Sequence, residues 1–136
     1  MSNVILDTDI LSSLMRGNAD VIMKARDYLR THPRLTISII TRYEILRGLK
    51  AKTAVKQERA FERFSAMSLV VLPVTETVIF QAAEIYADVY KRGELILDND
   101  IFIAATALVG GYRVITNNER HFRRITGLTV ENWLKP

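Results

Sequence analysis

The sequence contains no cysteine and only two histidines, His32 and His121. Without cysteine the chain cannot form disulfides, thiolate zinc sites or a cysteine nucleophile, and two histidines make a poor zinc site. No stretch approaches the ~18 uncharged apolar residues that cross a bilayer. The N-terminus also lacks the positive flank, apolar run and cleavage site of a secretory signal. We therefore expect a cytoplasmic protein without a membrane anchor, in which any metal is held by oxygen atoms.

The composition that is present is typical of a globular domain. The 136 residues are 49% hydrophobic and 25% charged, and a chain of this length can bury roughly two thirds of its unfolded surface. We expect a single domain over residues 1–136. The net charge of +4 and the pI near 9.6 suit a polyanionic partner such as nucleic acid, but a solvated basic surface explains them equally well.

Short apolar runs alternate with helical patterns along the chain. The predicted strands cover residues 4–6, 35–37, 69–72, 112–115 and 128–130. The predicted helices cover residues 8–15, 39–49, 53–66 and 101–109, with a further helix capped by Asn18 or Asp20 that runs to residue 29, and a long one from residue 78 that stops at Gly93. This order predicts an α/β fold, a three-layer α/β/α sandwich with a central, mainly parallel sheet of four to five short strands.

Acidic side chains follow the first predicted strand, in the stretch VILDTDIL. Ligands of open parallel sheets gather beyond the carboxyl ends of the strands, which makes Asp7 and Asp9 candidates for a site. Either residue could instead cap the helix that follows. Glu44 lies next to the apolar face of its helix, where an unpaired carboxylate is costly. Its alternative explanation is an ion pair with Arg47.

Further polar groups are expected at the same sheet edge. Asp98 and Asp100 precede the apolar helix, where one of them could serve as a cap. Thr116 and Asn118 follow the fourth predicted strand, although TNN could also be an ordinary turn. Carboxylates that converge repel one another unless a cation compensates them. Oxygen ligands select Mg²⁺ or Mn²⁺, ions that suit hydrolysis of a phosphodiester.

The whole chain resembles PIN-domain ribonucleases, in particular the VapC-type toxins of bacterial toxin-antitoxin pairs, including their FitB-like branch. The fragments that carry the resemblance are ILDTDIL, SIITRYEILRG, DNDIFIAATAL, VITNNERHF and GLTVENW, in this order and spacing. The resemblance implies a PIN-like fold. It also implies an endoribonuclease that depends on Mg²⁺ or Mn²⁺ and cleaves RNA with a metal-activated water.

The same resemblance implies roles for individual residues. Asp7 and Asp100 are the expected metal ligands, Glu44 is a further acid of the site, and Asp98 is an additional acid at the rim. Thr116 and Asn118 occupy the T-x-[Asp/Asn] position, where family members often have an acid. Because Asn118 is neutral, it weakens the case for two tightly held metals.

Partners also follow from the resemblance. They are an RNA substrate, a small VapB-like antitoxin, and further copies of the chain in a homodimer or a larger toxin-antitoxin assembly. RNA phosphates would meet basic side chains. The candidates are Arg47, Lys50, Lys52 and the run Arg120, His121, Arg123 and Arg124, and for each a solvated surface position is the alternative.

Two other functions fit part of the pattern. A haloacid-dehalogenase-like phosphohydrolase also begins with an apolar strand followed by D-x-D, and would use Asp7 as a nucleophile. Leu11 stands where that motif usually has Thr or Val, and no suitable lysine motif follows. The other alternative is a non-catalytic nucleic-acid-binding module, in which the acids are only helix caps and ion-pair partners.

Overall fold

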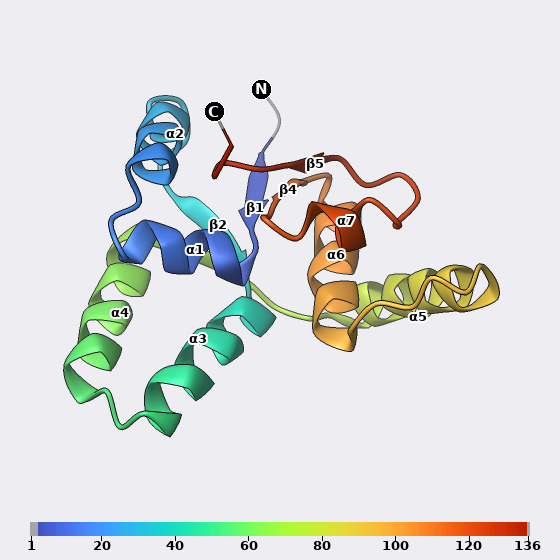
Figure 1. Cartoon of the computed structure of the whole chain (residues 1–136), viewed down its shortest axis with the longest axis horizontal. Coiled ribbons are helices and arrows are strands. Elements are labelled where there is room, and N and C mark those ends of the chain that lie inside the picture. Colours follow the sequence, from blue (N-terminus) through green and yellow to red (C-terminus); the bar gives the residue numbers. More distant parts are fainter. Residues whose placement is uncertain (1–2, 136) are drawn as a thin grey trace.

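The computed structural model describes residues 3–135. Figure 1 shows the elements along the chain, and each short strand is followed or preceded by helices. The elements are β1 (Val4–Leu6), α1 (Thr8–Met15), α2 (Ala19–Leu29), β2 (Leu35–Ser38), α3 (Ile39–Ala51), α4 (Val55–Ser68), β3 (Leu69–Leu72), α5 (Glu76–Lys91), α6 (Asp98–Gly110), β4 (Arg113–Ile115), α7 (Glu119–Phe122) and β5 (Val130–Glu131).

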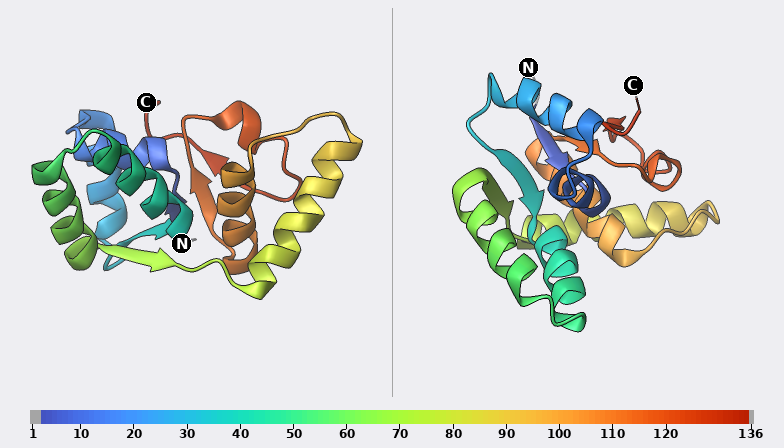
Figure 2. Two further views of the ribbon diagram at one scale, coloured as in Figure 1. Left: turned by 90° about the horizontal axis from the view of Figure 1, so that it is seen from below. Right: turned by 60° about the vertical axis from the view of Figure 1, so that its left-hand side comes forward.

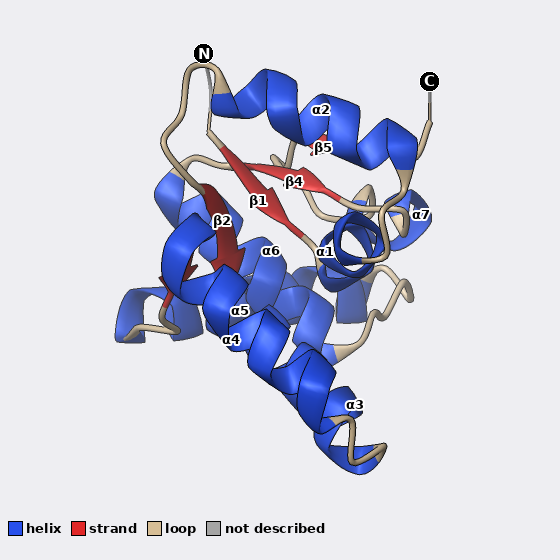
Figure 3. Ribbon diagram, turned by 90° about the vertical axis from the view of Figure 1, so that its left-hand side faces the viewer, coloured by secondary structure: helices blue, strands red, loops and turns tan. Residues whose placement is uncertain are grey.

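The paired strands are all parallel. Backbone hydrogen bonds join β1, β4 and β5 into one sheet, in that order, and β2 and β3 into a second. Because β1 also lies between β2 and β4 (Figure 3), the strands follow one another as β3-β2-β1-β4-β5. The parallel sheet of five short strands is confirmed, with its ladder of hydrogen bonds interrupted between β2 and β1.

Two apolar cores lie on opposite faces of these strands. Val4 and Leu6 of β1 pack with residues of α1, α2 and α4, whereas Ile5 between them packs with residues of α5 and α6. This alternation is the two-residue period of an extended strand. Helices therefore cover both faces, and the three-layer α/β/α sandwich is confirmed. Figure 2 shows α3 beside α4 on one side of the molecule and α5 beside α6 on the other.

Local sequence signals set several of the helix ends. The side chains of Asn18, Ser38 and Thr75 each accept a backbone N–H in the first turn of α2, α3 and α5, which satisfies donors that have no partner within the helix. Gly111 ends α6 in the left-handed conformation with φ 73°, a geometry that glycine adopts without steric cost.

The bounds of several elements differ from the expectation; α4, for example, covers Val55–Ser68 rather than residues 53–66. α6 begins at Asp98 rather than at residue 101, because its first turn is polar and hides the start of the apolar pattern. β5 covers Val130–Glu131 rather than residues 128–130. α7 is a helix of only 4 residues, too short to show a period. In residues 3–135, none of the helices combines the length and the apolar character that a membrane crossing requires.

Candidate active site

The first part of the site forms where β1 and β4 end. Leu6 and Ile115 are partners in the ladder, so Asp7 and Thr116 leave the sheet side by side. The Thr116 hydroxyl donates to Asp7 Oδ2 at 2.7 Å, and both residues are buried. Asp7 Oδ1 also accepts the Thr8 N–H at 2.8 Å and caps α1. Asp7 is therefore both a helix cap, as one interpretation of the sequence held, and a member of the polar cluster.

Glu44 joins this cluster from α3. The Thr8 hydroxyl donates to Glu44 Oε1 at 2.6 Å, and the Asn99 amide donates to Glu44 Oε2 at 3.3 Å. Glu44 also forms the expected ion pair with Arg47, at 3.6 Å between Nη2 and Oε2. This pair accounts for only one of its contacts, because the other two link α3 to α1 and α6. The ion pair with Arg47 is thus confirmed, and the role of Glu44 in a site stays a prediction.

Asp100 and Asn118 close the other side of the cluster. The Asn118 amide donates to Asp100 Oδ2 at 3.3 Å, and the Asn118 backbone N–H donates to the Thr116 hydroxyl at 2.9 Å. The loop after β4 therefore connects Asp7 to Asp100. The N-cap of α6 is Leu97, which offers no side-chain hydrogen bond, so the prediction that Asp98 or Asp100 caps α6 is wrong. Asp98 is exposed in the first turn.

Asp9 is a member of the cluster that the sequence analysis left without a role. Its Oδ2 accepts the Asn117 backbone N–H at 3.1 Å, whereas its Oδ1 is buried without a hydrogen-bond partner. A buried carboxylate oxygen without a partner is costly unless a ligand or a cation satisfies it. The D-x-D spacing was a signal for this role, but a helix cap explained it equally well.

Burial and mutual repulsion raise the pKa values of these acids. Burial first, and then the Asp9 charge, raise the pKa of Asp7 to about 7, against the opposing hydrogen bonds from Thr116 and Thr8. Burial also raises the pKa of Asp9 and that of Asp100; Glu44 adds to both shifts, and His121 opposes the shift of Asp100. The charged forms of the acids are therefore destabilised unless positive charge is added.

The donor set fits a hard divalent cation. It consists of carboxylate, hydroxyl and amide oxygens, which Mg²⁺ prefers over nitrogen or sulfur ligands. Within residues 3–135, however, no three histidine, aspartate or glutamate side chains are grouped closely enough to hold an ion between them. Mg²⁺ commonly keeps several waters and uses one or two carboxylates. The ligand pair Asp7 and Asp100 is compatible with this habit and stays a prediction.

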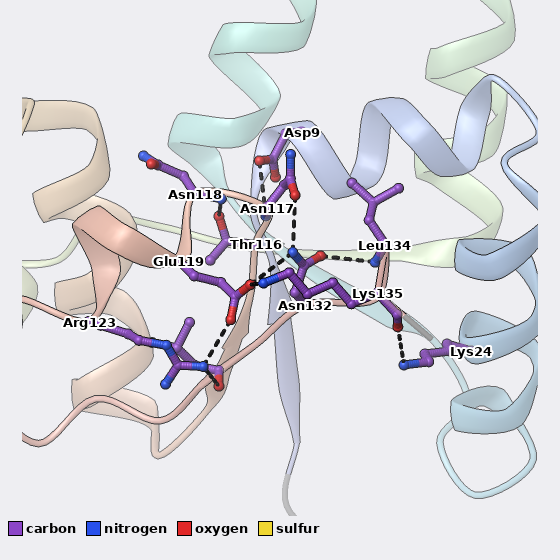
Figure 4. Close-up of polar contacts among 11 residues, drawn as sticks. Asp9, Lys24, Thr116, Asn117, Asn118, Glu119, Arg123, Asn132, Leu134 and Lys135 are labelled. Atoms are coloured by element: carbon purple, nitrogen blue, oxygen red, sulfur yellow. Dashed lines mark hydrogen bonds and ion pairs between the residues drawn. The ribbon is translucent and has the colours of Figure 1, made fainter.

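The C-terminal segment is joined to the loop after β4 by hydrogen bonds (Figure 4). Buried Asn132 donates from Nδ2 to Asn117 Oδ1 at 3.0 Å and to Glu119 Oε2 at 3.1 Å. Hydrogen bonds from Lys135 and Arg123, together with Asn132, lower the pKa of Glu119 to about 2. This network fixes Asn117, whose backbone N–H holds Asp9. We refer to it below as the C-terminal brace.

Comparison with known proteins agrees with this arrangement. The PIN domain pattern matches residues 4–128. The chain belongs to the PIN domain family. "Ribonuclease VapC1" from Haemophilus influenzae (strain R2866) is similar to this PIN protein, with 31% identity over 131 residues, which cover 96% of this chain and 97% of the relative.

Solved structures lead to the same family. A chain of DNA-bound VapBC from Salmonella typhimurium has a TM-score of 0.84 and 29% identity, covering 98% of this chain and 99% of that one. A chain of FitAcB from Neisseria gonorrhoeae has a TM-score of 0.79 and 25% identity, covering 98% and 99%. The resemblance to VapC-type PIN proteins and to the FitB-like branch is confirmed, and the phosphohydrolase alternative is not favoured.

The basic candidates in this PIN protein differ in how they are paired. Arg47 and Lys50 form ion pairs with Glu44 and Glu58. Arg123 and Arg124 pair with Glu119 and Glu94, and His121 Nδ1 lies 2.9 Å from the Asn118 amide. His121 therefore borders the cluster, while exposed Lys52 lines a groove beside Glu44.

Proposed function

We propose that this protein is an endoribonuclease that depends on Mg²⁺ or Mn²⁺ and acts as the toxin of a toxin-antitoxin pair. The observation that carries the proposal is the cluster at the carboxyl ends of β1 and β4. In it, hydrogen bonds join Asp7, Thr116, Asn118 and Asp100, and Thr8 links Glu44 to Asp7. Similarity to a protein named ribonuclease VapC1 supports the choice of RNA as the substrate.

Each side chain of the cluster has its own role in the proposed hydrolysis. Asp7 and Asp100 would hold the cation, and Thr116 and Asn118 fix the orientation of these two acids through their hydrogen bonds. Glu44, oriented by Thr8 and Asn99, accepts a proton from the attacking water. Cleavage leaves a 5′-phosphate and a 3′-hydroxyl. A bound Mg²⁺ supplies the positive charge that polarises the phosphoryl oxygen, orients water and neutralises the leaving oxygen.

The partners follow from the proteins that this chain resembles. The similar solved structures are those of VapBC and FitAcB, which supports a small VapB-like antitoxin as the partner of this chain. The same similarity supports a homodimer or a larger toxin-antitoxin assembly. We expect this assembly to work in the cytoplasm, where its RNA substrate is found.

The proposal is tested with purified, antitoxin-free protein and a mixed RNA pool, with and without Mg²⁺, followed by mapping of the cut ends. Wild type should cleave only with the metal. Asp7→Asn and Asp100→Asn should lower the cleavage rate by ~100-fold or more. Mutation of a residue that only supports a metal ligand already costs ~10–100-fold in affinity or activity. Asp27→Asn, on the exposed side of α2, makes the same charge change away from the cluster and should cleave as wild type does.

Three results would count against the proposal. Metal-dependent turnover of small phosphomonoesters but not of RNA would favour the phosphohydrolase. RNA binding that a chelator leaves unchanged, without any cleavage, would favour a non-catalytic binding module. Full cleavage by Asp7→Asn in a preparation free of other nucleases would remove the cluster from the mechanism.

A further inference from the structure

A groove of about 430 Å³ lies between α1, α3 and the start of α4. Thr8 and Glu44, members of the acidic cluster, are among the residues that line it. The groove continues along α3 past Gly48 to Lys52, and these positions follow Glu44 at intervals of four residues. Residues four apart share one face of a helix, so the groove leads away from the acids along α3. We call it the α1–α3 groove.

Gly48 forms an open part of this groove. A Cβ atom placed on Gly48 would meet no atom within 4 Å, and the residue lies inside the helix Ile39–Ala51. A glycine inside a helix is less stable than alanine by ~1 kcal/mol, and packing within the chain does not require it here. Because glycine has no side chain, a ligand can approach the helix backbone at Gly48 more closely than it could at any other residue type.

The groove also carries positive charge from Arg16 and Lys52. Arg16 donates to the Ser13 hydroxyl at 3.3 Å, and within residues 3–135 neither Arg16 nor Lys52 forms an ion pair. Both are exposed. The apolar part of the lining comes from Met15, Ile45 and Leu49. Cations beside an apolar floor complement a phosphate joined to a flat base.

We propose that the α1–α3 groove binds the nucleotide of single-stranded RNA that neighbours the scissile phosphate. The base lies over Gly48 against Ile45 and Leu49, and the next phosphate lies between Arg16 and Lys52. Single-stranded RNA suits this groove because its bases are free to turn away from the backbone. The proposal rests on the proposed function, since it assigns the groove to the substrate of the neighbouring acids.

The first test compares Gly48→Ala and Gly48→Leu with wild type. Binding of a short single-stranded RNA is measured by fluorescence anisotropy in EDTA, where cleavage does not interfere, and cleavage of the same RNA is measured separately in Mg²⁺. Both variants should melt a few degrees higher, because both residues favour a helix. Gly48→Leu should nevertheless raise the Kd for RNA by about tenfold or more, the size of one lost stacking contact, and Gly48→Ala by less.

The second test removes the two cations one at a time. Arg16→Gln and Lys52→Gln should each reduce the slope of log Kd against log salt concentration by about 0.7, the value for one phosphate contact of a single strand. Lys91→Gln is the matched control, because Lys91 is exposed at the far end of α5, away from α1 and α3 (Figure 1). It should leave the slope unchanged.

The outcomes separate this proposal from the proposed function. Unchanged RNA affinity and cleavage in a folded Gly48→Leu protein would overturn the groove assignment while leaving the nuclease in place. Loss of antitoxin binding with unchanged RNA affinity would assign the groove to the antitoxin and overturn the proposal as well. If wild type binds RNA but never cleaves it, the nuclease proposal fails, whereas weaker binding by Gly48→Leu would still support the groove as an RNA site.

Discussion

Single side chains in this PIN protein serve the fold and the site together. Asp7 caps α1 through Oδ1 and accepts the Thr116 hydroxyl through Oδ2. Glu44 pairs with Arg47 and also joins Thr8 to Asn99. A carboxylate with such fixed neighbours is oriented before any ligand arrives, which is what a catalytic acid needs. The same burial makes its charge costly to maintain.

The free-energy cost of burying the charged carboxylate of Asp7 predicts how stability changes with pH in the metal-free protein. Because the pKa of Asp7 rises from 3.8 to about 7 on folding, the folded chain keeps a proton that the unfolded chain has released. The resulting stabilisation is complete below the unfolded pKa and is lost as the pH rises through the folded value. In EDTA, the contribution of Asp7 should therefore lower the melting temperature between about pH 4 and about pH 7.

Asp7→Asn is the decisive variant for this prediction. It should flatten the pH profile and melt above wild type at about pH 8, with a smaller slope left by Asp9 and Asp100, whose pKa values are also raised. Asp27→Asn should keep the profile of wild type. Parallel profiles for wild type and Asp7→Asn in a melting series would show that Asp7 is not destabilised by burial.

The residues that the sequence predicts for the site lie together in the structure, whereas some of their contacts could not be predicted from the sequence. The five predicted residues are Asp7, Glu44, Asp100, Thr116 and Asn118. Direct hydrogen bonds, or a partner that two of them share, join them into one cluster. Asn99 was missed, and Asp9 was a candidate whose role was left open. Asn99 lies 55 positions from Glu44, and spacing along the chain does not encode such a contact.

At the scale of elements, the loop after β4 depends on a segment that follows it in the chain. The C-terminal brace joins Asn132 to Asn117 and Glu119, and Lys135 to Glu119. Lys24 of α2 in turn donates to the Lys135 carbonyl. β5, beside β4, brings this segment into place. The site therefore depends on residues beyond position 128, where the PIN domain match ends.

Removing the brace should weaken both the fold and the site. Asn132→Ala leaves Asn117 Oδ1 and Glu119 Oε2 without this donor, which should lower the free energy of unfolding by ~1–3 kcal/mol. Cleavage should slow by ~10–100-fold, the usual effect of losing a supporting contact. Urea denaturation and RNA cleavage below the melting transition measure the two effects. Lys24 makes an exposed contact with the same segment, so Lys24→Gln should change the free energy of unfolding and the cleavage rate only slightly. A Lys24→Gln protein that cleaves RNA as slowly as Asn132→Ala would contradict this explanation.

The elements themselves were predictable to the extent that their patterns were long. The ends of α1, α2 and β3 agree with the sequence analysis, because caps and apolar periods mark them. α7 and β5 contain 4 and 2 residues, and tertiary contacts, rather than local propensity, decide such short elements. The break between β2 and β1 in the hydrogen-bond ladder also has no signal in sequence.

For the molecule as a whole, the site joins the two cores. Asp7 and Glu44 come from α1, α3 and the strand beside them, whereas Asp100 belongs to α6, on the opposite face of the sheet. A ligand that holds Asp7 and Asp100 together would therefore stabilise both halves at once. Such binding adds stability in proportion to the logarithm of ligand concentration over Kd.

This geometry predicts that Mg²⁺ stabilises the entire chain. At about pH 8, each tenfold rise in Mg²⁺ above its Kd should add about 1.4 kcal/mol to the free energy of unfolding. Differential scanning calorimetry should show a single transition that moves upward. Asp100→Asn should lose most of this shift and Asp27→Asn should keep it. An equal shift in both variants would mean that the ion acts elsewhere on the surface.

The order of the acids and the brace along the chain has a consequence for synthesis. Asn118 and Asn132 follow Asp7, Glu44 and Asp100 in the sequence. Because a domain generally folds as a unit during synthesis, a nascent chain can contain all three acids while it still lacks Asn118, which donates to Asp100, and Asn132, which fixes Asn117. The proposed nuclease site is therefore complete only after these later residues have left the ribosome.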